Sequence, residues 1–104
     1  MGLRGFTLRD TDVPDTGAAY LESFPGLRIL RLGWTRITDR SLSSLGRLTK
    51  LQELDLEANR ITDAGLKQLV GLSELRELNV GMTQVTQAGC AALQLALPDC
   101  EIRL

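Results

Sequence analysis

The chain has 104 residues, 13 acidic and 12 basic side chains, no histidine and a formal net charge of −1. This length fits one domain, and the near balance of charge excludes the strongly basic surface expected of a nucleic-acid-binding protein. No apolar run approaches the roughly 18 residues that a membrane span requires. Residues 1–16 contain no apolar signal core, so we expect a cytoplasmic protein with no membrane partner.

A spacing of 24 residues organises the chain into similar units. In chain order the units are 3–26, 27–50, 51–74 and 75–98, followed by a terminal half-repeat at 99–104. The first unit is degenerate but in register, with Leu3, Phe6, Leu8 and Val13 in the places of Leu27, Leu30, Leu32 and Ile37. The register of the half-repeat is open by one residue, because 98–100 also resembles 24–27 after a one-residue shift.

Each unit predicts one strand, one turn and one helix. In the unit 51–74, the alternation around Leu54 and Leu56 predicts a short strand with one buried face. Leucines then recur every three residues from Leu66, which predicts a helix or 3₁₀ segment with one inward stripe. Thr62 or Asp63 is expected to cap the start of that helix. No unit can bury its own leucines, so the units are expected to stack.

The shared pattern is L-x-x-L-x-L-x-x-T/N-x-I/V-T-D-x-G-L-x-x-L-x-x-L, and it covers essentially the whole chain. It resembles the leucine-rich repeat family, in a subtype similar to that of bacterial repeat proteins and of cysteine-containing repeats in F-box substrate receptors. The resemblance implies one α/β domain over 1–104. It is expected to form a horseshoe-shaped solenoid segment with a parallel sheet on the concave face and helices on the convex face.

One polar position follows each strand. Asn59 stands where such repeats carry an asparagine that hydrogen-bonds loop backbone, and Thr11, Thr35 and Thr83 are its equivalents. We expect this column to have a structural role rather than a ligand-binding one.

The side chains between the buried leucines are expected to point outward from the concave sheet. They include an acidic cluster, which Glu101 extends, and the only tryptophan of the chain, Trp34. Tryptophan and arginine are enriched at interface hot spots, and an acidic surface can steer a basic partner. The predicted protein-binding residues are Ile29, Arg31, Trp34, Glu53, Asp55, Glu57, Glu77, Asn79 and Met82.

Two readings of this surface are open. The acidic column is either a binding surface or ordinary solvated surface balanced by Arg31, Arg36, Arg60 and Arg76. Trp34 is either an exposed anchor or a packing residue that covers Arg9, Asp10 or Ala58.

The sequence indicates no enzyme. It lacks histidine, a P-loop, a dinucleotide fingerprint and a G-x-S-x-G element. We expect no cofactor and no metal, because the carboxylates form no loop of oxygen ligands. Cys90 and Cys100 are expected to be reduced thiols that pack as small apolar groups.

The resulting hypothesis is a module that binds another protein on its concave face. The alternative is a structural end piece of a longer solenoid or a self-associating unit. The first repeat begins almost at Met1 without a capping helix, and the chain stops within a fifth strand. Both outer strands would then expose unpaired backbone, which predicts possible homodimer formation through strand edges.

Overall fold

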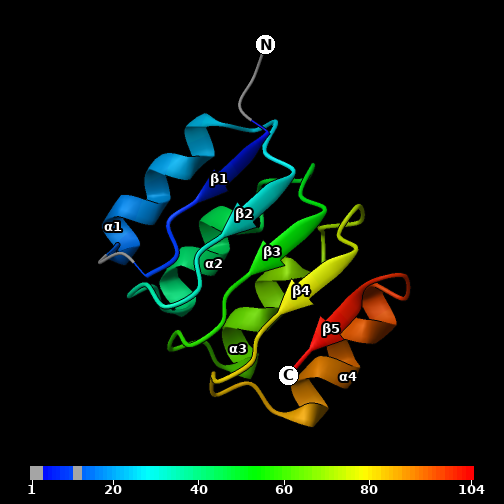
Figure 1. The fold of residues 1–104 in the computed structure, drawn as a ribbon. Coiled ribbons are helices and arrows are strands. Elements are labelled where there is room, and N and C mark those ends of the chain that lie inside the picture. Colours follow the sequence, from blue (N-terminus) through cyan, green and yellow to red (C-terminus); the bar gives the residue numbers. More distant parts are fainter. Residues whose placement is uncertain (1–3, 11–12) are drawn as a thin grey trace.

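The computed structural model describes residues 4–10 and 13–104. Leu3 and Thr11, named above for the first unit, lie outside the described residues. The strands form one parallel sheet in sequence order (Figure 1). They are β1 (Gly5–Thr7), β2 (Ile29–Arg31), β3 (Glu53–Asp55), β4 (Glu77–Asn79) and β5 (Glu101–Arg103).

The helices form a second layer on one side of the sheet (Figure 1). They are α1 (Asp15–Ala18), the 3₁₀ helix η1 (Ala19–Ser23), α2 (Asp39–Leu45), α3 (Asp63–Leu66), the 3₁₀ helix η2 (Lys67–Leu69) and α4 (Gln87–Ala96). The predicted order of strand, turn and helix is therefore confirmed in the four full units. The opposite face of the sheet, which the helices do not cover, is called the sheet face below.

The 24-residue spacing is also the register of the sheet. Leu30 pairs with Leu54, Leu54 with Leu78, and Leu78 with Ile102. The last pair settles the open register of the half-repeat, because β5 continues the spacing without a shift. The leucines between the layers are almost completely buried, including Leu32 and Leu56. Burying one such side chain contributes about 1.5–3 kcal/mol, so the stacked leucines supply the main stabilisation.

The polar column after the strands has the structural role expected of it. The Asn59 side-chain amide donates to the carbonyl oxygens of Leu32 (2.8 Å) and Leu56 (3.2 Å), so it ties two units together. The hydroxyls of Thr35 and Thr83 donate within their own turns, to Leu32 and Val80 respectively. The Thr35 hydroxyl also lies 3.2 Å from the Asn59 side-chain oxygen, so both the threonine and the asparagine connect neighbouring units at this position.

A carboxylate ladder joins the starts of neighbouring helices. Asp39 accepts hydrogen bonds from the Thr62 amide (2.8 Å) and hydroxyl (2.5 Å) of the next unit. Asp63 accepts the equivalent pair from Thr86, at 2.8 and 2.6 Å. The T-D pair of the second and third units therefore links successive units: its threonine donates to the preceding unit and its aspartate accepts from the following one.

The first rung of this ladder contains an extra donor. Asp15 accepts from the Thr38 amide and hydroxyl and also from the Ser41 hydroxyl at 2.5 Å. Partial burial would raise the pKa of Asp15, but the hydrogen bonds from Ser41 and Thr38 outweigh that effect and lower it. The hydrogen bonds from Thr86 likewise lower the pKa of Asp63. These hydrogen bonds therefore favour the ionised form of Asp15 and of Asp63.

The ladder corrects the predicted capping of α3. The Thr62 side chain accepts no capping bond, its hydroxyl donates to Asp39, and Asp63 accepts from Thr86 rather than from its own helix. The equivalent threonines of α2 and α4 do accept a capping bond from Arg40 and Gly89 respectively. The sequence pattern indicated a polar helix start, but the acceptor of the Thr62 hydroxyl, Asp39, lies 23 residues earlier in the chain.

The glycine of the T-D-x-G pattern makes room for the ladder. A Cβ on Gly65 would overlap the carboxylate of Asp39, and one on Gly89 would overlap that of Asp63. At the equivalent place in the second unit, the Ser41 hydroxyl reaches Asp15 and joins the rung. These positions are therefore small because a carboxylate from the preceding unit occupies the adjacent space.

Gly65→Ala is expected to lower the free energy of unfolding by about 1–2 kcal/mol, because displacing Asp39 leaves the buried donors of Thr62 without their acceptor. This loss exceeds the roughly 1 kcal/mol that alanine gains in helix propensity. The matched control is Gly71→Ala, where an added Cβ meets no atom within 4 Å, and it is expected to be near neutral. Urea unfolding followed by circular dichroism measures both.

The same experiment in an Asp39→Ala background tests the cause. With the carboxylate absent, Gly65→Ala is expected to cost less than in the wild type, giving a favourable coupling in the double-mutant cycle. Strict additivity of the two changes would contradict the proposed role of Gly65.

Candidate functional site

The candidate site is the sheet face, where two rows of side chains run across the strands. One row consists of Gly5, Ile29, Glu53, Glu77 and Glu101, and the other of Thr7, Arg31, Asp55, Asn79 and Arg103. A shallow hollow of about 180 Å³ crosses β2 to β5. Its charged and polar lining consists of Arg31, Glu53, Asp55, Glu77, Asn79 and Arg103. The structure therefore brings most of the predicted sheet-face residues together.

Arg9 crosses this face and neutralises part of the acidic cluster. It follows β1, yet its guanidinium donates to Asp55 at 2.9 Å and to Glu57 at 2.7 Å, two units further along. The arginine passes over Gly33, where a Cβ would lie only 2.6 Å from Nη1 of Arg9. The sequence analysis named Arg9 only as a residue that Trp34 could cover. The absence of a side chain at position 33 is the one signal that could have indicated this crossing.

The acidic residues consequently differ in their availability to a partner. The hydrogen bond from Arg9 lowers the pKa of Glu57. Asp55 is held twice, by Arg9 and by the Glu57 amide at 3.0 Å, just as Asn79 accepts from the Gly81 amide at 3.0 Å. These three side chains are therefore part of the framework of the turns as well as of the surface.

We call the row that contains Glu53, Glu77 and Glu101 the outer row. Its acids make fewer contacts within the chain than Asp55 and Glu57 do. Glu53 forms a partly exposed ion pair with Arg31 at 3.4 Å, and Glu101 forms one with Arg103, also at 3.4 Å. Glu77, which lies between them, has no ion pair or hydrogen bond through its carboxylate with any described residue. Of the arginines predicted to balance the cluster, Arg31 does so, whereas Arg60 and Arg76 pair with no acid in the described part of the chain.

Trp34 and Met82 lie at the edge of this face rather than over its hollow. Both adopt left-handed backbone angles, with φ of 58° and 56°, as do their counterparts Asp10 and Ala58. Trp34 is 45% exposed and Met82 70% exposed. The Trp34 indole N–H donates to Glu57 at 3.3 Å, so the ring is held by one hydrogen bond while nearly half of it faces solvent.

The remaining reactive groups show no arrangement for chemistry. Cys90 and Cys100 are unpaired, and burial raises the pKa of the Cys100 thiol to about 11, which keeps it protonated at neutral pH. Within the described residues, no three His, Cys, Asp or Glu side chains gather closely enough to hold a metal ion. The helices of the described part include none long and apolar enough to cross a membrane.

Comparison with known proteins establishes the family. The leucine rich repeat family model matches residues 25–85. Because this match covers more than half of the chain, the chain belongs to the leucine-rich repeat family. A search of curated proteins finds no match.

Two solved structures share the fold. An internalin from Listeria monocytogenes aligns with 97% of this chain at a TM-score of 0.65 and 16% identity. A leucine-rich repeat protein from Leptospira interrogans aligns with 83% of the chain at a TM-score of 0.59 and 22% identity. The aligned part is 34% of the internalin and 27% of the Leptospira protein. At these identities, the likeness shows the leucine-rich repeat solenoid itself.

Replacing Arg9 by glutamine is expected to lower stability at pH 7 and to have less effect in acid. The pKa of Glu57 is lower in the folded chain than its ordinary value of about 4.3. Its pairing with Arg9 therefore stabilises the fold above that value and is lost as pH falls through the folded pKa. The urea midpoints of wild type and variant should accordingly converge between pH 7 and pH 3. A constant difference would show that Arg9 acts through packing alone.

Trp34→Ala is expected to leave the fold intact and to cost about 1–2 kcal/mol, because it removes one exposed hydrogen bond and the packing of a side chain that is only partly buried. The control Leu32→Ala, in the fully buried row, is expected to cost about 2–5 kcal/mol. Thermal unfolding distinguishes the two readings of Trp34: a loss comparable to that of Leu32→Ala would make it a packing residue.

Proposed function

We propose that this chain is a protein-interaction module that binds a partner protein on its sheet face. The leucine-rich repeat family commonly mediates protein–protein interaction, and proteins of this fold are generally non-enzymatic binding modules. The hollow across β2 to β5, lined by charged side chains on rigid strands, is the observation that supports this face. The unpaired cysteines fit a reducing compartment, and we place the function in the cytoplasm.

The outer row of acids suggests the chemistry of the partner. Glu53, Glu77 and Glu101 are direct register partners on neighbouring parallel strands. Like charges directly opposite each other destabilise a sheet, and Glu77 has no cation among the described residues to offset this. A lysine or arginine of the partner placed over Glu77 would remove that repulsion. Ile29 and Arg31 at the other end of the hollow would contact its flanking residues.

A second candidate function is self-association through the sheet edges. β1 and β5 each pair with a strand on one side only, and such edges invite pairing with another chain. Light scattering coupled to size exclusion at several concentrations distinguishes this candidate, because edge pairing predicts a mass that doubles as concentration rises.

Charge reversal tests the sheet face directly. The Glu53→Lys/Glu77→Lys variant is expected to lose the proteins that immobilised wild type retains from a native lysate, with an unchanged circular dichroism spectrum. The control is Gln68→Lys, an exposed position on η2 in the helix layer, which is expected to retain them. Retention of the same proteins by all three chains would refute binding on the sheet face.

A further inference from the structure

A second surface lies where the strands run into their turns. We call it the loop edge, comprising residues 33–38, 57–62 and 81–86. A hollow of about 370 Å³ opens between its first two segments, within the size range of ligand sites. Its lining residues include Thr35, Ile37, Ala58 and Asn59, with Arg36 and Arg60 as its charged members. Among residues 4–10 and 13–104, none of those that line this hollow is a carboxylate, in contrast to the hollow on the sheet face.

The floor of this hollow consists of buried residues, and hydrogen bonds fix their positions. Thr35, Ile37 and Asn59 are buried, at 8%, 0% and 6% exposure. Asn59 donates to the carbonyls of two units, and the Trp34 amide donates to the Glu57 carbonyl at 2.8 Å. The two segments that border the hollow are therefore held in a fixed relation by backbone and side-chain hydrogen bonds, so little ordering is needed when a ligand enters.

Apolar residues with left-handed backbone angles follow the loop edge, and the middle one, Ala58, lines the hollow. Trp34, Ala58 and Met82 stand in one row along the loop edge, and all three have left-handed backbone angles that disfavour residues with a Cβ. Glycine or asparagine would suit these positions better. The counterpart Asp10 shares this conformation, so it belongs to the turn of the repeat, and Trp34 and Met82 differ from the others in exposing a large apolar side chain there.

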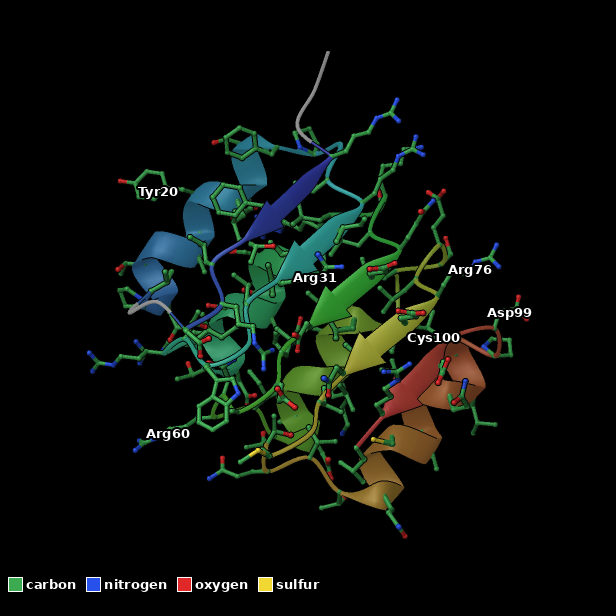
Figure 2. The ribbon with its side chains drawn as sticks, viewed as in Figure 1. Tyr20, Arg31, Arg60, Arg76, Asp99 and Cys100 are labelled. Atoms are coloured by element: carbon green, nitrogen blue, oxygen red, sulfur yellow. The ribbon has the colours of Figure 1, made fainter. Side chains whose placement is uncertain are left out.

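The loop edge also carries an exposed positive charge, that of Arg60. The Arg60 guanidinium pairs with no acid in the described part of the chain, and Figure 2 shows it pointing outward from the loops. Glu57 lies in the same turn as Arg60, but it is already bonded to Arg9 and to the Trp34 indole. Arg60 thus lines the hollow on one side without an acidic partner among the described residues, and the exposed Trp34 directly precedes Thr35 on the other side.

From these observations we infer that the loop edge binds an extended peptide segment in which a carboxylate side chain adjoins a large apolar one. The carboxylate enters the hollow beside Arg60, whose guanidinium forms a charge-assisted pair with it. The apolar side chain covers Trp34 and Ala58. This surface has the opposite charge preference to the sheet face and does not depend on the function proposed there.

The test uses the full chain as target for a phage-displayed library of random 12-residue peptides. Enriched peptides are expected to carry Asp or Glu next to Leu, Ile, Phe or Trp. The strongest is then synthesised with a fluorophore, together with its Asn or Gln counterpart, and binding is measured by fluorescence polarisation. The acid is expected to bind at least about tenfold more tightly than its amide counterpart, the ratio that corresponds to 1.4 kcal/mol.

Matched variants locate the binding. Arg60→Ala and Trp34→Ala are each expected to weaken the acidic peptide by about tenfold or more. Arg76→Ala and Tyr20→Ala serve as controls, because they truncate an unpaired arginine at the opposite strand ends and an exposed aromatic in the helix layer (Figure 2). The controls are expected to bind as the wild type does. In the unaltered chain, emission from Trp34 should also shift on binding, since it is the only tryptophan.

Three outcomes would overturn the inference. They are the absence of acidic–apolar peptides from the selection, equal binding of the acid and its amide counterpart, and undiminished binding by Arg60→Ala or Trp34→Ala. Enrichment of basic peptides alone, with binding lost in Glu53→Lys/Glu77→Lys, would support the sheet face while refuting the loop edge. The two proposals can therefore fail separately.

Discussion

The burial of leucines between neighbouring units is the constraint on which the rest of the structure depends. A single unit has a three-residue strand and one short helical segment, and its leucines become buried only against the unit beside it. The register is therefore 24 residues, the offset at which Leu54 lies opposite Leu78 while the outward-facing Glu53 and Asp55 lie opposite Glu77 and Asn79. Both candidate surfaces inherit this spacing, because their side chains occupy the positions between and after those leucines.

Polar groups then lock the stack that burial creates. The carboxylate ladder joins the helix starts through Asp15, Asp39 and Asp63, and Asn59 joins two turns. The described ladder begins at Asp15 and ends at Thr86, with Pro14 in the place of the threonine and Gln87 in the place of the aspartate. Leucine burial is non-directional, so these directional bonds are what hold each unit at a defined height and angle to the next.

The rigid stack presents two surfaces, the sheet face and the loop edge, which differ in the sign of their charge. On the sheet face, Arg9 neutralises Asp55 and Glu57 and leaves Glu77 as the uncompensated charge. At the loop edge, Arg60 is the uncompensated charge, and Trp34 lies between the two surfaces with its indole bonded to Glu57. A partner that combines basic and acidic–apolar segments would engage both surfaces, and the variants described above separate the two contributions.

The sequence by itself determined the fold, because leucines that recur at a spacing of 24 residues become buried when the units stack. It also determined which residues face outward from β2, β3 and β4, since strand periodicity assigns alternate side chains to opposite faces. Only the tertiary structure decided the partners of the polar groups: that Thr62 donates to Asp39 instead of capping α3, and that Arg9 reaches Asp55 across Gly33. Hydrophobic periodicity repeats along the chain and is visible in one unit, whereas a hydrogen bond or ion pair between residues 23 or 46 positions apart depends on distances that exist only after the units have stacked.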